Sequence, residues 1–193
     1  MWIKICGLTS AAGVAAGLAM QVDALGFVFA DSVRRVSPQQ ALALARPARS
    51  QVRCVAVTRH PSQGLIDEVL EVFGPDVLQG DVAELARLRL PVTLELLPVV
   101  RARVAAPAPL PARILFEGPV SGKGALSDWQ AAEVLARRTQ LVLAGGLSPG
   151  NVAAAIGAVR PFGVDVSSGV EGAPGVKSPA LIESFVRNAR AAP

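Results

Sequence analysis

The chain has 193 residues, of which 51% are hydrophobic and 18% charged, and its formal net charge at pH 7 is +4. A chain of this length is expected to fold as one domain, residues 1–193, with a substantial buried core. No apolar segment approaches the roughly 20 residues needed to cross a bilayer, and residues 1–10 read as a strand and a loop rather than a signal peptide. We therefore expect a cytoplasmic protein with no membrane partner.

The numbers and positions of the cysteine, histidine and arginine residues argue against a metal site and against a nucleic-acid-binding site. The cysteines, Cys6 and Cys54, lie in strand-like runs without metal-ligand spacing, and the single histidine, His60, cannot form a cluster. We therefore expect no metal ion. The positive charge comes mostly from scattered arginines without interleaved aromatic residues, which predicts no nucleic-acid partner. A mild positive charge instead favours capture of a small anionic substrate.

Strand-like and helix-like segments alternate along the chain. Apolar runs predict strands at residues 2–6, 24–30, 52–58, 76–78, 92–96, 113–117, 141–144 and 162–166. Helix-start residues and apolar periodicity predict helices at about 11–20, 37–44, 62–72, 81–88, 127–138, 149–159 and 179–191. Residues 97–113 contain four prolines, so any helix there is at most a stub.

This alternation predicts an α/β fold, a compact (β/α)8 TIM barrel with a reduced or missing helix after strand 5. Active sites of this architecture lie at the carboxyl ends of the strands. The residues at or just after the predicted strand ends are therefore the candidates for a site. They are Cys6, Asp31, Arg34, His60, Gln79, Glu95, Glu117, Gly145, Gly146, Ser167, Ser168 and Gly169.

The loops after the last two predicted strands suit a phosphate group. One loop begins with Gly145 and Gly146, and the other with Ser167, Ser168 and Gly169. Consecutive parallel strands bring such loops side by side, and glycines let the backbone approach a ligand closely. Amide N–H groups with two hydroxyls then make a neutral cradle for phosphate, although two ordinary turns would give the same pattern.

Four motifs, in order along the chain, resemble the phosphoribosylanthranilate isomerase family of tryptophan biosynthesis. They are KICGLT at residues 4–9, GFVF at 26–29 with RRVSP at 34–38, LAGGLSPGNV at 143–152, and VDVSSGVE at 164–171. The resemblance spans nearly the whole chain and is weakest between residues 76 and 113. It implies an Amadori rearrangement of N-(5'-phosphoribosyl)anthranilate to 1-(2-carboxyphenylamino)-1-deoxy-D-ribulose 5-phosphate by general acid–base catalysis. It also implies that no cofactor is needed, and members of the family occur as monomers and as homodimers.

The resemblance assigns roles to particular residues. Cys6 matches the general base, and Glu117 stands where the family has an aspartate as general acid. Arg34 matches the residue that holds the anthranilate carboxylate. The phosphate-binding residues implied are Gly145, Gly146, Ser167, Ser168 and Gly169.

The chain departs from the family pattern at two of these strand ends. Glu117 is one methylene longer than aspartate, and Gln79 replaces the family's histidine after strand four. Asp128 is the second candidate for the acid, although its place suits a helix cap. Residues 122–124, Gly-Lys-Gly, match the family's loop after strand six, which could cover the site.

The sequence also predicts a buried ion pair beside the candidate base. Lys4 alternates onto the same side of its strand as Cys6, which points it into the barrel. We expect Lys4 to pair with Asp165, because either charge alone would be costly to bury. A cation near Cys6 would favour the thiolate that a base requires.

Two other functions stay open from the sequence. Another phosphate-binding barrel enzyme, such as indole-glycerol-phosphate synthase, would need a catalytic lysine inside the barrel with a partnering glutamate, and the motif around Cys6 argues against it. A catalytically weak or inactive barrel that binds a phosphorylated ligand is the second alternative, and Glu117 and Gln79 motivate it.

Overall fold

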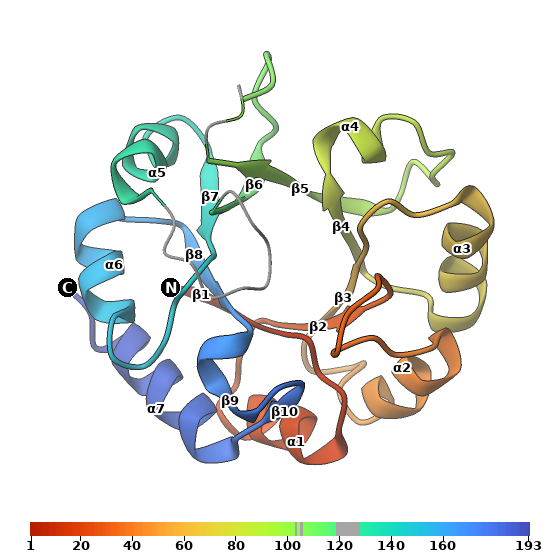
Figure 1. Cartoon of the computed structure of the whole chain (residues 1–193), viewed down its shortest axis with the longest axis horizontal. Coiled ribbons are helices and arrows are strands. Elements are labelled where there is room, and N and C mark those ends of the chain that lie inside the picture. Colours follow the sequence, from red (N-terminus) through yellow and green to blue (C-terminus); the bar gives the residue numbers. More distant parts are fainter. Residues whose placement is uncertain (103, 105, 119–127) are drawn as a thin grey trace.

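The computed structural model describes residues 1–102, 104, 106–118 and 128–193. Its eight main strands pair in parallel and in chain order, and the eighth closes on the first. Figure 1 shows the strands as an inner ring with helices outside it. The predicted (β/α)8 barrel is confirmed.

The barrel strands are β1 (Trp2–Cys6), β2 (Ala24–Val28), β3 (Arg53–Val57), β4 (Val77–Asp81), β5 (Glu95–Arg101), β6 (Arg113–Glu117), β7 (Gln140–Leu143) and β8 (Gly163–Val166). The helices are α1 (Ala11–Ala19), α2 (Pro38–Ala45), α3 (Gln63–Glu68), α4 (Val82–Leu85), α5 (Trp129–Ala136), α6 (Val152–Val159) and α7 (Pro179–Arg190). A π-helical turn, Val69–Phe73, extends α3. A 3-10 turn, Ser168–Val170, follows β8.

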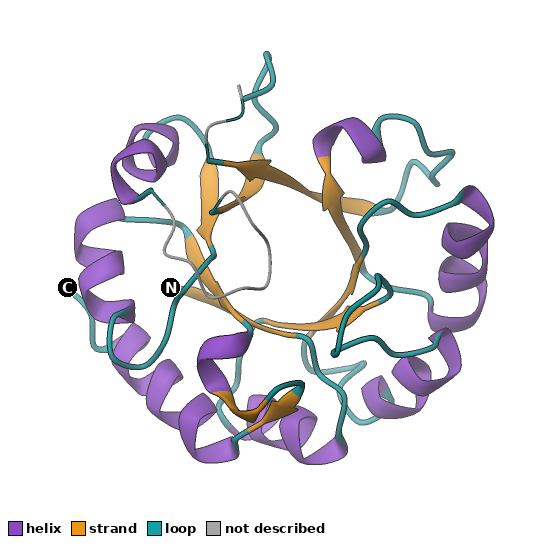
Figure 2. Cartoon of the chain, in the orientation of Figure 1, coloured by secondary structure: helices purple, strands orange, loops and turns teal. Residues whose placement is uncertain are grey.

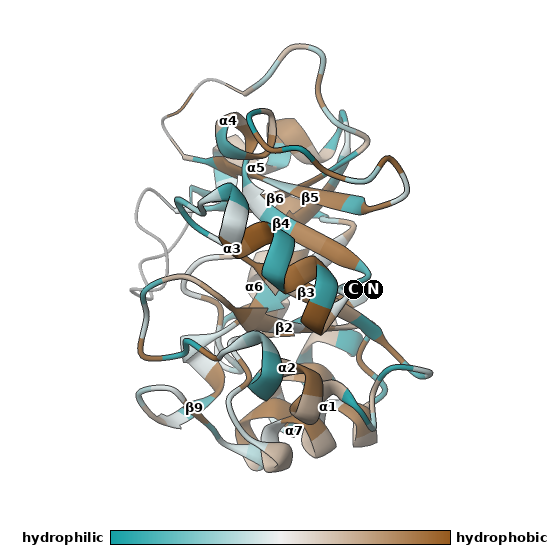
Figure 3. Cartoon of the chain, turned by 90° about the vertical axis from the view of Figure 1, so that its right-hand side faces the viewer, coloured by the Kyte–Doolittle hydropathy of each residue, from teal (hydrophilic) through white to brown (hydrophobic). Residues whose placement is uncertain are grey.

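The strands are nearly continuous apolar runs because both faces of the barrel wall are covered. Ile3 and Ile5 of β1 belong to the core between strands and helices. A second cluster fills the barrel interior and comprises Ala24, Val55, Val77, Leu97, Val99, Leu115, Val142 and Ala144. In the side view of Figure 3, α3 carries brown and teal segments, typical of a helix with one face on a core.

Serine residues begin several of the helices, as the sequence predicts. The Ser37 hydroxyl accepts a hydrogen bond from the backbone N–H of Gln40, and the side-chain oxygen of Gln40 accepts one from the backbone N–H of Ser37, which forms a capping box before α2. The predicted start of α6 at residue 149 is wrong. Helix α6 begins at Val152, because Asn151 accepts a hydrogen bond from the N–H of Ser148 and makes the intervening residues a turn.

No helix is found between β5 and β6 among the described residues, in agreement with the sequence. The described residues between these strands are loop in Figure 2, where the outer ring has a gap between α4 and α5. The turns there contain three of the four prolines noted above, which cannot donate helical hydrogen bonds. The predicted helix at 81–88 is also shorter, because β4 continues to Asp81 and α4 ends at Leu85.

The fifth strand is displaced from its predicted position. The sequence predicts it at residues 92–96, but β5 is Glu95–Arg101. Pro98 lies inside this strand, and its missing N–H makes the segment resemble a loop. In a parallel sheet each residue bonds to one neighbouring strand, so Pro98 removes a single ladder bond. The displacement moves Glu95 to the amino end of the barrel and brings Arg101 to the carboxyl end.

A short hairpin after β8 has no counterpart in the sequence prediction. Strands β9 (Glu171–Ala173) and β10 (Val176–Lys177) pair antiparallel. Gly175 turns the chain between them with a φ of +79°, a backbone conformation that glycine adopts without strain. The hairpin fixes Glu171 and Lys177 next to the carboxyl end of the barrel.

Candidate active site

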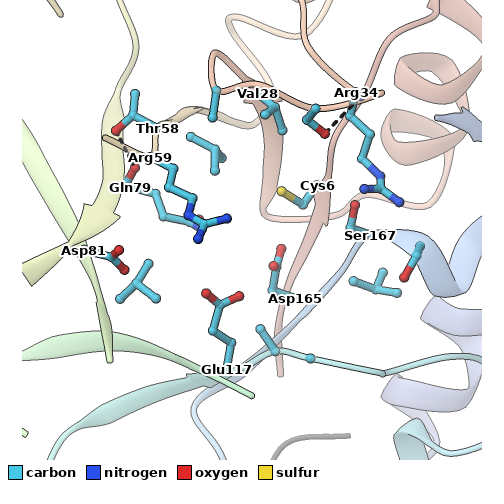
Figure 4. A pocket seen from close by; sticks show the side chains of 18 of the residues that line it. Cys6, Val28, Arg34, Thr58, Arg59, Gln79, Asp81, Glu117, Asp165 and Ser167 are labelled. Atoms are coloured by element: carbon cyan, nitrogen blue, oxygen red, sulfur yellow. Dashed lines mark hydrogen bonds between the residues drawn. The ribbon is translucent and has the colours of Figure 1, made fainter. Parts of the chain in front are cut away.

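The carboxyl ends of the strands surround a cavity of about 180 Å3. Every barrel strand, or the loop that follows it, contributes to the lining. The sequence candidates that line it are Cys6, Asp31, Arg34, Gln79, Glu117, Gly145, Gly146, Ser167 and Ser168. Figure 4 shows the Cys6 thiol and the Glu117 carboxyl group pointing into the same space. The structure therefore brings the two expected proton-transfer groups to one cavity.

Cys6 is the last residue of β1 and is buried beside Gly26 of β2. A Cβ atom at Gly26 would lie 3.1 Å from Cys6 Sγ, so the glycine leaves room for the thiol. Burial raises the pKa of Cys6 above its ordinary value, and the Asp165 carboxylate adds to this rise. The cations of Lys4 and Lys177 lower it, but burial outweighs them. The protonated thiol is therefore the favoured form at neutral pH.

The predicted pair between Lys4 and Asp165 is present inside the barrel. Lys4 has no solvent exposure, and its Nζ donates a hydrogen bond to Asp165 Oδ1 at 2.8 Å. The two residues are direct partners in the pairing of β1 with β8. Burial alone would lower the pKa of Lys4, but Asp165 and Cys6 raise it above its ordinary value. Lys4 therefore remains a cation next to Cys6.

Glu117, the last residue of β6, is held by an arginine that the sequence analysis does not single out. Arg101 lies opposite Glu117 in the pairing of β5 with β6, and its Nη1 donates to Glu117 Oε1. Its Nη2 donates to Asp81 Oδ1 at 2.7 Å. Arg101 and Asp81 both line the cavity. The misplaced fifth strand explains why Arg101 is missed, since its prediction puts Glu95 at this strand end.

Arg34, in the loop after β2, is fixed by Glu171 of the β9–β10 hairpin. Its Nε donates to Glu171 Oε1 at 2.7 Å and its Nη2 to Oε2 at 2.9 Å. Lys177 Nζ lies 2.7 Å from the same Oε1. Burial alone would raise the pKa of Glu171, but the hydrogen bonds from Arg34 and Lys177 lower it to about 2. Arg34 is therefore a positioned cation at the edge of the cavity.

The two glycine and serine loops lie side by side, as the sequence predicts. A Cβ atom at Gly169 would lie 1.9 Å from the carbonyl oxygen of Leu147, so only glycine allows the loops to pack this closely. Gly145 and Gly146 have φ angles of +89° and +68°. Asn151 Nδ2 donates to the Gly146 carbonyl at 2.8 Å and closes the first loop. Gly169 supports the loops from behind rather than lining the cavity.

Lys177 connects the second of these loops to the arginine site. Its Nζ donates to the Ser167 carbonyl at 3.0 Å and lies 3.3 Å from Ser167 Oγ, while it also contacts Glu171. Burial lowers the pKa of Lys177, and Glu171 opposes this effect. Glu171 lies in a motif quoted from the sequence, but a contact with Arg34, 137 residues away, has no local signal.

Gln79, where the family pattern has a histidine, lines the cavity with its side-chain amide. The residue is 6% exposed, and its buried Oε1 has no hydrogen-bond partner among the residues that the structure describes. Arg59, from the loop after β3, also lines the cavity, and Figure 4 shows its guanidinium reaching toward the centre. Among the residues the structure describes, no hydrogen bond or ion pair involves the Arg59 side chain. Arg59 is not among the site residues predicted from the sequence.

The remaining candidates lie away from the cavity. Glu95 pairs with Arg53 and Arg113 at the amino end of the barrel, which corrects its expected place at a carboxyl end. His60 is exposed beside Glu84, and Cys54 is buried in the outer core. Asp128 accepts a hydrogen bond from Ala131 N–H as the cap of α5. The loop at 122–124 lies outside the described residues.

The described residues carry neither a metal cluster nor a membrane-spanning helix. There, no group of three or more His, Cys, Asp or Glu side chains is arranged to hold a metal ion. None of the helices in the same part of the chain is long and apolar enough to cross a membrane.

Comparison with known proteins gives one consistent family. Residues 3–188 match the family model described as N-(5'phosphoribosyl)anthranilate (PRA) isomerase. The N-(5'-phosphoribosyl)anthranilate isomerase of Mesorhizobium japonicum is 39% identical over 98% of this chain and 95% of its own. The crystal structure of TrpF from Jonesia denitrificans is 36% identical, with a TM-score of 0.81 over 100% of this chain and 98% of its own.

A third match is a phosphoribosyl anthranilate isomerase crystallised with reduced 1-(o-carboxyphenylamino)-1-deoxyribulose 5-phosphate. It is 30% identical, with a TM-score of 0.78 over 98% of both chains. The family model and the curated relative cover nearly all of the chain, and the solved structures share its barrel. The chain therefore belongs to the N-(5'-phosphoribosyl)anthranilate isomerase family.

Proposed function

We propose that this chain catalyses the Amadori rearrangement of N-(5'-phosphoribosyl)anthranilate to 1-(2-carboxyphenylamino)-1-deoxy-D-ribulose 5-phosphate in tryptophan biosynthesis. The observation that carries the proposal is that a thiol, a carboxyl group, an anchored arginine and a glycine and serine cradle all border one cavity. The substrate has two anionic ends and a sugar between them, so it needs two anchors and two proton-transfer groups.

Glu117 acts as the general acid in this proposal. Its protonated carboxyl group gives a proton to the furanose ring oxygen while the bond between that oxygen and C1 breaks. The lone pair of the substrate nitrogen fills the vacancy at C1 and forms a protonated Schiff base. The substrate supplies its own electron sink, so the step needs no cofactor.

Cys6 acts as the general base. Its thiolate takes the proton from C2, and the electrons of that C–H bond form an enolamine, which tautomerises to the ketone. The thiol is the favoured form of Cys6 at rest. The form that reacts is a different one, with a proton on Glu117 and none on Cys6. Lys4 supports this form because its cation lowers the pKa of Cys6. Proton transfer of this kind contributes about 10²–10⁴-fold in rate.

Each end of the substrate has its own anchor on the cavity wall. Gly145, Gly146, Ser167 and Ser168 bind the phosphate, and Gly169 allows their loops to pack together. Arg34 binds the anthranilate carboxylate with the guanidinium edge that Glu171 leaves unused. A guanidinium suits a carboxylate because it presents several N–H donors in one plane.

The direct test is turnover of freshly made phosphoribosylanthranilate by the wild type. Cys6→Ala and Glu117→Gln should each lower kcat by at least about a hundredfold while phosphate still binds. Cys54→Ala and Glu95→Gln are matched controls, since Cys54 lies in the outer core and Glu95 at the far end of the barrel. Near-normal turnover in either site variant would remove that residue from the mechanism.

A barrel that binds the ligand without converting it is the second candidate. Glu117 favours it, because the Arg101 guanidinium favours the ionised form of the carboxyl group, which has no proton to donate. A wild-type protein that binds the reduced product analogue but shows no turnover would support this alternative.

We also infer that residues 1–193 are one domain, since eight strands close into one barrel. The proposed substrate carries a phosphate and does not cross a membrane, which supports a cytoplasmic location for this protein. Either a monomer or a homodimer fits the proposal. One solved structure shows monomers generated from the dimeric enzyme of Thermotoga maritima, 28% identical over 98% of both chains with a TM-score of 0.77.

A further inference from the structure

Three charged side chains form a row across the ends of three neighbouring strands. Asp81 ends β4, Arg101 ends β5 and Glu117 ends β6. Arg101 donates hydrogen bonds to both carboxylates, to Asp81 Oδ1 at 2.7 Å and to Glu117 Oε1. The three side chains are between 14% and 23% exposed, so solvent screens them only in part. Their charges are therefore coupled.

The contact with Arg101 conflicts with the role of Glu117 as an acid. A guanidinium remains charged at any pH the protein experiences, and it favours the ionised form of a neighbouring carboxyl group. A general acid must instead carry a proton when the substrate arrives. Arg101 fixes the position of Glu117, whose side chain has one more rotatable bond than aspartate. Without a second carboxylate, however, Arg101 would favour the ionised form of Glu117, which cannot donate a proton.

Asp81 offsets this effect because it shares the same cation. With Asp81 ionised, the Asp81 and Arg101 pair has no net charge, and Glu117 accepts a hydrogen bond from a neutral pair rather than from an isolated cation. We propose that the Asp81–Arg101 pair is a positioning device for Glu117, in which Arg101 orients the carboxyl group and Asp81 restores its ability to hold a proton. The inference rests on the proposed function, in which Glu117 is the acid.

Other charged groups border the cavity from the remaining strands. Asp165 comes from β8, where Lys4 neutralises it, and Cys6 ends β1. Arg59 follows β3, and Arg34 follows β2, where Glu171 holds it. Both variants keep these groups. A difference between the pH profiles of the two variants is therefore caused by the change in the row of Asp81, Arg101 and Glu117.

The test is the dependence of kcat/KM on pH for Asp81→Asn and Arg101→Met. Asp81→Asn leaves the Arg101 cation without its second carboxylate, so the limb of the profile that Glu117 sets should move to lower pH by about one unit. Arg101→Met removes the cation and should move the same limb to higher pH by a similar amount. The limb set by Cys6 should stay in place in both variants.

Arg113→Met is the matched control. Arg113 forms an ion pair with Glu95 between the same two strands, β5 and β6, at the other end of the barrel. Losing this pair should leave both limbs where the wild type has them. Arg101→Lys keeps the charge but not the fork of donors, so it should lower kcat with little displacement of the limb.

Opposite displacements by Asp81→Asn and Arg101→Met would support the inference, and displacements of the same sign, or none, would overturn it. Carbon-13 NMR of the Glu117 carboxyl group, assigned by its loss in Glu117→Gln, measures the same displacements without turnover. If the wild type lacks turnover, the proposed function fails, while this titration still decides whether Asp81 and Arg101 control the proton of Glu117. Thermal unfolding of each variant checks that the barrel is folded.

Discussion

Lys4 and Asp165 meet inside the barrel, where the ammonium group lies 2.8 Å from the carboxylate and has no contact with solvent. The pair lies against Cys6, and its two charges act on the thiol in opposite directions. The same contact therefore contributes to folding and to the chemistry of the site.

Lys4→Met should both destabilise the barrel and deactivate Cys6. The variant leaves the Asp165 carboxylate buried without its cation, which costs about 3–5 kcal/mol, and it raises the pKa of Cys6 further. Urea unfolding and the rate of Cys6 alkylation against pH, in a Cys54→Ala background, measure the two effects. The double variant Lys4→Met/Asp165→Leu should regain most of the stability without regaining the turnover. Full turnover in Lys4→Met would contradict a role for its charge.

Glu171 should make stability depend on pH in the acid range. Its pKa is about 2 in the folded chain against an ordinary value of 4.5. The unfolded chain thus binds the proton first, so the contribution of Glu171 is full above about pH 4.5 and is lost as the pH falls toward 2. The free energy of unfolding of wild type minus that of Glu171→Gln should shrink over this interval. A difference that is constant with pH would show that the ion pairs with Arg34 and Lys177 do not stabilise the fold.

Arg34→Ala should weaken binding at one end of the substrate only. Loss of charged hydrogen bonds to the anthranilate carboxylate should raise KM by about ten- to a hundredfold. Binding of inorganic phosphate, followed by calorimetry, should hardly change. Its exposed neighbour supplies the control, because Arg35→Ala should leave both quantities near the wild-type values. Equal losses for substrate and phosphate would reject the assignment.

Gln79→Met should stabilise the protein and weaken ligand binding at the same time. The buried Oε1 of Gln79 has no partner in the described part of the chain. Replacing such a group by an apolar side chain of similar shape removes a desolvation cost, for a gain of about 1 kcal/mol. In the wild type, the Gln79 amide can rotate and form a hydrogen bond with a sugar hydroxyl. Methionine cannot form this bond, so the affinity of Gln79→Met for the reduced product analogue should be lower. Denaturant unfolding and calorimetry measure the two quantities. Loss of stability in Gln79→Met would mean that the amide has a structural partner instead.

Gly169→Ala should separate the two phosphate-binding loops. Its methyl group would meet the carbonyl oxygen of Leu147 at 1.9 Å, so the backbone must move, at a cost of about 1–3 kcal/mol. Phosphate affinity should fall with it. Gly157→Ala in α6 is the control, because no atom lies within 4 Å of the added Cβ and an alanine should stabilise the helix by about 0.5–1 kcal/mol. Unchanged phosphate binding in Gly169→Ala would remove the loops from the binding site.

The sequence predicts those parts of the site that lie within one strand or in the loop directly after it. Cys6 and Lys4 follow from the alternation of one strand, and the glycine and serine loops follow from two strands with turn residues after them. Arg101 is not predictable in this way, since Pro98 hides the true strand.

Contacts between distant elements give no local pattern either. Glu171 reaches Arg34 only because a hairpin of five residues in two strands folds back over the barrel end. Positions of this kind depend on how the barrel closes, and closure is a property of all eight strands together.

Lys177 fixes the distance between the two anion-binding sites at the mouth of the barrel. One buried ammonium group joins the serine loop to the carboxylate that immobilises Arg34, so the interval between the two anion anchors is held by a rigid internal brace. A compound carrying the same terminal charges on a shorter or longer spacer could reach one anchor at a time. Selectivity would then follow from molecular span, independently of the groups that transfer protons.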